Sequence, residues 1–179
     1  MEEVKYNAMQ KLKREMFAMR NGVVADALRK GGCPFKVIFG VNLPQLSQIA
    51  AGFGPSLQLA LQAWADSSTR ESMLIAPMLM PPEEFTKELA LQWIAQAPSP
   101  EVVDVLCLKL LRHAAYALPL AQELLCRQGL MERYAGLRLM CNLAPSHPRL
   151  AAAVGQAFIS SAQGILRQPA AVLASYADE

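Results

Sequence analysis

The sequence has no hydrophobic run long enough to cross a membrane, since none reaches the roughly 18–20 uncharged residues that a span needs. The longest uncharged stretch, residues 150–166, is rich in Ala, Gly, Gln and Ser, which is typical of a closely packed helix in water. The first seventeen residues, MEEVKYNAMQKLKREMF, are charged throughout and lack the apolar segment of a signal peptide. We therefore expect a cytoplasmic protein with no membrane partner.

Residues that bind metals or form disulfides are also scarce. They comprise Cys33, Cys107, Cys126 and Cys141, none of them in a CxxC pair, together with His113 and His147. Because a structural zinc needs four closely spaced ligands, we expect no metal site, and we interpret the cysteines as reduced, buried small hydrophobes. The sequence contains no Gly-rich loop that could bind a phosphate, and its Ser, His and Asp residues follow no recognisable order of a catalytic triad. We therefore expect no cofactor.

The composition instead favours helices. Apolar residues make up 53% and charged residues 18% of the 179 positions, which excludes a disordered chain. Ala, Leu, Met and Gln dominate, while β-branched and aromatic residues are sparse. Pro and Gly lie mostly between the apolar stretches, where they end helices. Only residues 36–41 could be extended.

These breaks divide the chain into short helices joined by short links. The expected helices cover residues 3–20, 24–30, 44–53, 57–65, 70–78, 83–95, 101–113, 118–127, 130–143, 148–166 and 169–176. Asn42 and Ser99 stand at N-cap positions, and Pro100 is expected to be a first helical residue. Short links favour antiparallel neighbours. We therefore predict one all-α domain over residues 1–179, a right-handed α-α superhelix of HEAT-like antiparallel helix pairs. A globular helical bundle would show a similar pattern.

Charge is unevenly distributed along the chain. Residues 1–36 carry eight basic and four acidic groups, residues 37–104 two basic and seven acidic, and residues 105–167 seven basic and two acidic. Basic regions on either side of an acidic middle could bind a polyanion. They could equally be ordinary solvated faces.

Three segments resemble the AlkD-like DNA alkylation repair family when they are taken in order. The first is FGVNLPQLSQIA at residues 39–50, the second LQLALQAWADSSTRESMLIA at residues 57–76, and the third QWIAQAPSPEVVDVLCLKLL at residues 92–111. Weaker similarity continues beyond residue 130. The resemblance implies a HEAT-like superhelix with a concave, basic surface that binds double-stranded DNA, and removal of cationic N3- or N7-alkylated purines.

The resemblance also assigns a catalytic residue. Asp104 matches the Asp that stabilises the positive charge developing on the sugar during base release, a role that suits a carboxylate. Pro100 stands where the family has a Trp that contacts the lesion, and Met73 stands where the family has an Arg. The alternative for Asp104 is structural: it lies on the exposed stripe of its helix or pairs with a basic neighbour such as Lys109.

Basic residues around the third segment and after it are candidates to contact DNA phosphates. They are Lys109, Arg112, Arg127, Arg133 and Arg138, and the alternative is that they are solvated helix charges. Trp64 and Trp93 lie among Leu and Ala at helical positions, so we expect core anchors rather than base-stacking rings.

Two functions follow from these observations. In the first, the protein binds DNA and removes alkylated purines with Asp104. In the second, catalysis has been lost and the helical repeats bind DNA structures or a protein partner. Pro100 and Met73 favour the second.

Overall fold

The structure is a computed structural model that describes residues 6–178. In this part of the chain eleven α-helices and several short 3₁₀ helices account for the regular secondary structure. Residues 36–41 form no strand, and Val37 makes only an isolated parallel bridge with Thr69. The prediction of an all-α fold is confirmed.

The α-helices are α1 (Ala8–Ala18), α2 (Gly22–Lys30), α3 (Leu43–Phe53), α4 (Leu57–Ala65), α5 (Arg70–Leu79), α6 (Lys87–Gln96), α7 (Pro100–Lys109), α8 (Ala117–Leu125), α9 (Leu130–Leu143), α10 (Pro148–Ile159) and α11 (Arg167–Ser175). The 3₁₀ helices cover Pro82–Glu84, Leu111–His113, Ala144–Ser146, Gly164–Leu166 and Tyr176–Asp178. None of the helices in the described residues is long and apolar enough to cross a membrane.

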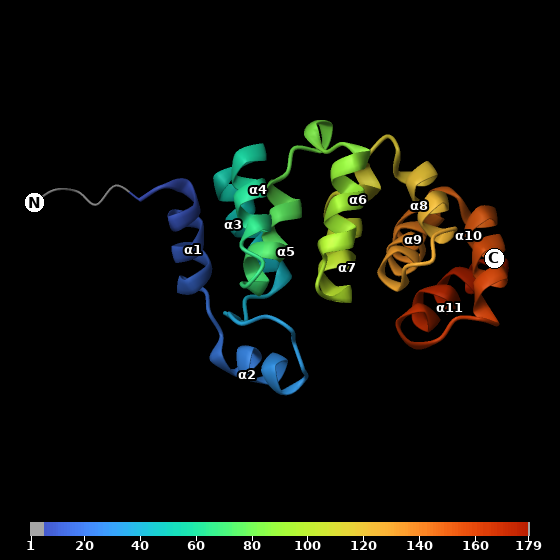
Figure 1. The fold of residues 1–179 in the computed structure, drawn as a ribbon, viewed down its shortest axis with the longest axis horizontal. Coiled ribbons are helices and arrows are strands. Elements are labelled where there is room, and N and C mark those ends of the chain that lie inside the picture. Colours follow the sequence, from blue (N-terminus) through green and yellow to red (C-terminus); the bar gives the residue numbers. More distant parts are fainter. Residues whose placement is uncertain (1–5, 179) are drawn as a thin grey trace, which may run out of the picture. The chain divides into compact units, whose positions relative to one another are not determined.

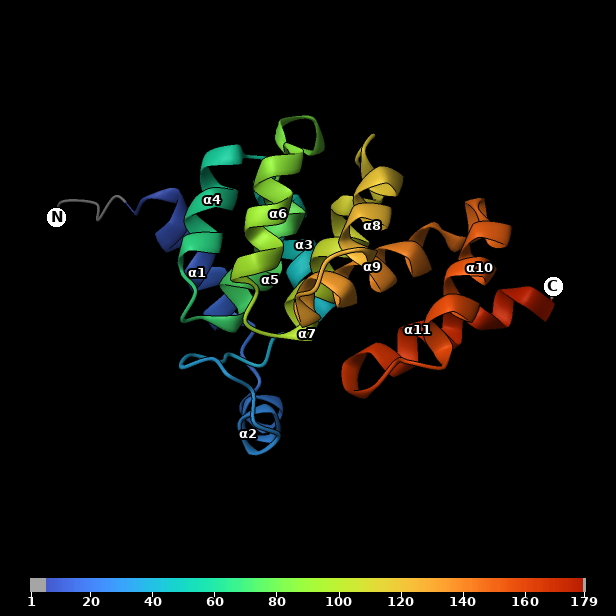
Figure 2. The ribbon, with the colours of Figure 1, turned by 45° about the vertical axis from the view of Figure 1, so that its right-hand side comes forward.

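The chain divides into two compact units, residues 1–84 and residues 85–179. In the first unit α4 packs against α5, α3 packs against α5, and α1 contacts α3 and α4 (Figure 1). The core of this unit includes Leu46, Ala60 and Leu74, none of which is exposed. The short helix α2 stands apart from α3, α4 and α5 in both views (Figures 1 and 2).

In the second unit α9 is the central helix, because α6, α7, α8 and α11 all pack against it. Helix α10 packs closely on α11 (Figure 2). At that contact Gly155 lies so near the α11 backbone that an added Cβ would stand 2.1 Å from the Ala174 nitrogen. The small residues of α10 therefore serve close helix packing.

The helix boundaries agree with the sequence prediction except at a few ends. Helix α1 begins at Ala8 rather than residue 3, because Asn7 and Gln10 form a reciprocal capping box. Of the predicted start, residues 3–5 lie outside the described residues. Helix α6 begins at Lys87 rather than residue 83, since the Thr86 side chain accepts the Leu89 N–H.

Two further expectations in the second unit need correction. The helix predicted over residues 148–166 ends at Ile159, and a 3₁₀ helix follows at Gly164–Leu166. Pro100 is the first residue of α7 as predicted, but Ser99 forms no side-chain cap hydrogen bond. The Ser99 Oγ is instead buried without a partner among the described residues.

The cysteines are all free, as predicted, but they are not all buried. Cys107 is buried and Cys126 is exposed, while Cys33 and Cys141 are intermediate. Burial of Cys107 raises the pKa of its thiol far above the ordinary value, so this group is an inert core thiol. Trp64 and Trp93 are 5% and 1% exposed, which confirms that both are core anchors.

Candidate nucleic-acid site around Asp104

Asp104 is the polar residue of an otherwise apolar stretch of α7. Val102, Val103 and Val105 are buried on either side of it, whereas the Asp104 side chain is 36% exposed. Helical periodicity explains the difference, since positions three or four apart share a face. Leu108, four residues later, is also exposed. Asp104 therefore lies on the solvent-facing stripe of its helix.

Two side chains of α9 hold the Asp104 carboxylate. The Tyr134 hydroxyl donates to Asp104 Oδ1 at 2.8 Å, and Arg138 Nε donates to the same oxygen at 2.7 Å. Tyr134 and Arg138 are four residues apart, so they lie on one face of α9, the face that packs on α7. Asp104 thus pairs with a basic residue, as in the structural alternative, but the partner is Arg138 of α9 rather than Lys109 of its own helix.

Both hydrogen bonds end on one oxygen of the carboxylate. Oδ2 accepts no hydrogen bond from the described residues, and the side chain is partly open to solvent. Such an oriented carboxylate can accept a hydrogen bond from water or stabilise a nearby positive charge through its second oxygen. The adjacent guanidinium of Arg138 offsets part of the negative charge.

The surroundings keep this arrangement in place. Burial and then the hydrogen bond to Asp104 raise the pKa of Tyr134 far above its ordinary value, so its hydroxyl stays protonated and can donate. Arg138 also donates from a terminal nitrogen to Gln168 Oε1 at 3.2 Å, which links α9 to α11. The side chain of Arg138 is 27% exposed. The site is thus a polar cluster at the surface of the second unit.

Arg127, another predicted DNA-binding residue, is held by acidic neighbours. It donates to Glu132 at 2.8 Å and to Glu123 at 2.7 Å. These two ion pairs raise the pKa of Arg127 above its ordinary value. Since both terminal nitrogens bind carboxylates, this side chain has less capacity to bind a phosphate than the sequence indicates.

The remaining predicted cations are dispersed. Arg133 lies over the Phe158 ring, with 5.4 Å between the guanidinium carbon and the ring centroid. Lys109 is five residues after Asp104, which places it about 140° around the helix axis. Arg112 is exposed in the 3₁₀ helix that follows α7. The structure therefore brings Arg138 to Asp104 and leaves the others on separate parts of the unit.

Tyr134 and Gln168 were not among the residues predicted from the sequence. For Tyr134 a signal was present, because its spacing of four residues from Arg138 places both on one helical face. Gln168 has no such signal, since it lies on another helix, 30 positions after Arg138 in the sequence.

The two departures from the family pattern have clear positions. Pro100 begins α7 one turn before Asp104, where it presents no aromatic face to a cationic base. Met73 is 1% exposed in α5 and belongs to the core of the first unit. Neither residue can take over the role of the side chain it replaces.

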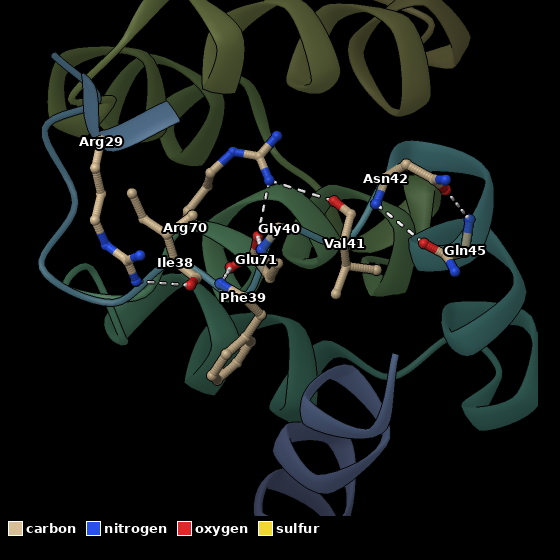
Figure 3. A network of polar contacts seen from close by, with 9 residues as sticks. All are labelled: Arg29, Ile38, Phe39, Gly40, Val41, Asn42, Gln45, Arg70 and Glu71. Carbon is tan, nitrogen blue, oxygen red and sulfur yellow. Dashed lines mark hydrogen bonds and ion pairs between the residues drawn. The ribbon is translucent and has the colours of Figure 1, made fainter. Parts of the chain in front are cut away.

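Glu71, two residues before Met73 in α5, forms a buried network in the first unit (Figure 3). Its Oε1 accepts from Gly40 N at 2.9 Å and from Arg70 at 2.8 Å, and its Oε2 accepts from Phe39 N at 2.9 Å. Gly40 has a φ of +77°, and an added Cβ would stand 2.2 Å from the Asn21 carbonyl oxygen, so glycine is required there. The side chain of Glu71 thus holds the loop before α3.

No group of three or more His, Cys, Asp or Glu side chains that could hold a metal occurs among residues 6–178. The polar groups of the Asp104 cluster are one carboxylate, one hydroxyl, one guanidinium and one amide. In that set the charges of the carboxylate and the guanidinium offset one another, and each group can form hydrogen bonds.

Comparison with known proteins agrees with these features. A solved structure described as "A new family of proteins related to the HEAT-like repeat DNA glycosylases with affinity for branched DNA structures" matches with a TM-score of 0.81 and 15% identity, covering 94% of this chain and 74% of that chain. This likeness confirms the predicted HEAT-like fold class. No curated protein matches. The model of the DNA alkylation repair enzyme family matches residues 12–159, so the chain belongs to that family.

Proposed function

We propose that this protein binds DNA and that its second unit supplies the phosphate contacts. The observation that carries the proposal is the distribution of ion pairs. Both acidic residues between positions 105 and 167, Glu123 and Glu132, are bound by Arg127. The cations of this region that form no ion pair with the described residues are Lys109, Arg112, Arg133, Arg149 and Arg167.

This excess of positive charge suits a polyanion. Each cation that neutralises a phosphate releases condensed counterions, so binding weakens as salt rises. The solved structure with the same fold is described as belonging to a family that is related to the HEAT-like repeat DNA glycosylases and has affinity for branched DNA structures. We therefore infer that both duplex and branched DNA are the ligands to test first.

Removal of an alkylated purine is the second candidate function. The open Oδ2 of Asp104 favours it, because that oxygen could face the sugar on which positive charge develops. The ion pair with Arg138 and the absence of an aromatic ring at Pro100 favour binding without catalysis. DNA binding is thus the function that the geometry supports best.

Substitution of Lys109 and Arg112 by Gln should weaken DNA binding. If each contacts one phosphate, the slope of log Kobs against log salt should become shallower by about two. The measurement is fluorescence anisotropy of labelled duplex and four-way-junction DNA over a salt series. Arg127→Gln is the matched control, since Arg127 already binds two carboxylates. A wild-type protein that binds neither DNA at low salt would contradict the proposal.

Base release can be tested separately with duplex DNA treated with a methylating agent. If Asp104 stabilises the transition state, Asp104→Asn should slow release of the free base by about 10²–10³-fold, because the amide carries no charge. Unchanged affinity for unmodified duplex would show that the variant is folded. Equal release by the variant and the wild type would remove Asp104 from the reaction, and no release by either would leave binding as the function.

A further inference from the structure

Two aromatic rings paired with arginines lie on α1 and next to its ends, since Phe17 and Arg14 belong to the helix, Tyr6 precedes it and Arg20 follows it. The guanidinium carbon of Arg20 lies 4.1 Å from the centroid of the Phe17 ring, and that of Arg14 lies 4.3 Å from the centroid of the Tyr6 ring. Phe17 is 51% and Tyr6 is 38% exposed. Leu12 and Met16 already form the buried apolar side of α1, so the exposed Phe17 ring is not part of that buried side.

Phe17 also contacts a ring from another segment of the first unit. The Phe17 and Phe39 rings meet edge to face, with centroids 5.9 Å apart and an interplanar angle of 83°. The backbone of Phe39 is anchored, because its N–H donates to the buried carboxylate of Glu71 and the N–H of the next residue, Gly40, does the same (Figure 3). The aromatic pair is therefore positioned before any ligand arrives.

An open surface hollow accompanies the pair. It has a volume of about 480 Å³ and is lined by Lys13, Arg14, Phe17, Ala18 and Phe39. A second hollow of about 520 Å³ lies along the same helix, and its lining includes Tyr6, Lys11, Arg14 and Phe53. Arg14 lines both hollows, so one cation can contact a ligand in either.

The charge around these rings is positive. Lys11, Arg14 and Arg20 form no ion pair with the described residues, whereas Lys13 pairs with Asp66 at 2.8 Å. Glu15 is the one acidic residue of α1, and it lines the second hollow. A ligand that matches this surface carries negative charge and flat rings together.

We propose that the α1 patch, defined as Lys13, Arg14, Phe17, Arg20 and Phe39, binds single-stranded DNA. An unpaired base can stack on the exposed part of Phe17 or on the Arg20 guanidinium, while Arg14, which forms no ion pair with the described residues, contacts the phosphates. In a duplex the faces of the bases are covered by their neighbours, so a stacking surface of this kind suits an unpaired strand. The cations distinguish this ligand from an apolar peptide.

This inference rests on the proposed DNA-binding function but uses residues of the other unit. The α1 patch would bind an unpaired strand, and the cations of the second unit would bind duplex. Because the two sets of residues do not overlap, variants of each can be assayed against both kinds of DNA.

The test uses the full chain and an end-labelled oligo(dT) of about 12 nucleotides at low salt, followed by fluorescence anisotropy. Phe17→Ala should raise the Kd for this strand about ten-fold or more, because one stacking surface is lost. Phe17→Trp should preserve binding, since it keeps an aromatic face. Val23→Ala is the control, because Val23 is 83% exposed and lies outside the patch. Circular dichroism of each variant verifies that it is folded.

Duplex binding separates this inference from the proposed function. Phe17→Ala should leave the affinity for blunt duplex unchanged, whereas the Lys109 and Arg112 substitutions should reduce it. Failure of the wild type to bind oligo(dT), with duplex binding intact, would overturn the α1 patch alone and leave a protein as its occupant. Equal affinity of Phe17→Ala and wild type for oligo(dT), or tighter binding of oligo(rU), would also overturn it.

Discussion

Replacement of Glu71 by Ala should lower the free energy of unfolding of the first unit by about 3–5 kcal/mol. Glu71 is 0% exposed, and its carboxylate accepts hydrogen bonds from Arg70 and from the N–H groups of Phe39 and Gly40. Alanine would remove the negative charge from beside a buried guanidinium and leave two backbone donors without this acceptor. The loop that carries Phe39 would also lose its anchor.

Urea unfolding followed by tryptophan fluorescence measures this loss. Trp64 lies buried in α4 of the same unit, and a Trp93→Phe background removes the only other tryptophan. Glu83→Ala is the control, because Glu83 is an exposed glutamate of the same unit, and its effect should stay within about 0.5 kcal/mol. A loss below about 1 kcal/mol for Glu71→Ala would show that the network contributes little to stability.

Replacement of Trp93 by Ala should destabilise the second unit by about 3–5 kcal/mol. Trp93 is 1% exposed, and its ring lies 5.0 Å from the Phe85 ring, centroid to centroid, at an interplanar angle of 60°. Truncation removes this contact and leaves a cavity that the surrounding helices can close only in part. Trp93→Phe keeps an aromatic ring and should cost less.

Circular dichroism at a helical wavelength during urea unfolding follows this change. Leu130→Ala is the matched control in the same unit, since Leu130 is 58% exposed and its truncation creates no cavity. The prediction fails if Trp93→Ala and Leu130→Ala unfold at the same urea concentration. Such a result would mean that α6 packs more loosely than the structure indicates.

Local sequence signals placed most helices correctly. The predicted ranges 57–65 and 130–143 coincide with α4 and α9, because apolar periodicity and flanking turn residues agree there. The errors arose where two signals competed. Two prolines followed by two glutamates, at residues 81–84, are typical of a helix start. The Thr86 side chain nevertheless caps α6, which therefore begins at Lys87.

The candidate site was predictable only in part. Asp104 came from the resemblance to the family, and the family match over residues 12–159 confirms that resemblance. The ion pair of Arg127 with Glu123 had a local signal, since the two residues are four positions apart in the sequence. The role of each cation in binding DNA stays a prediction. The prediction that residues 1–179 form one domain is also untested.

Periodicity, breakers and caps in the sequence were enough to specify an all-helical chain, since each acts within a few residues of its own position. The contacts of Asp104 with Tyr134 and Arg138 and those of Glu71 with Phe39 and Gly40 join residues about 30 positions apart. Such contacts form when helices pack and bring distant side chains within hydrogen-bonding distance. Packing therefore selected which acid meets which base, and it left the rings of Phe17 and Phe39 together at the surface.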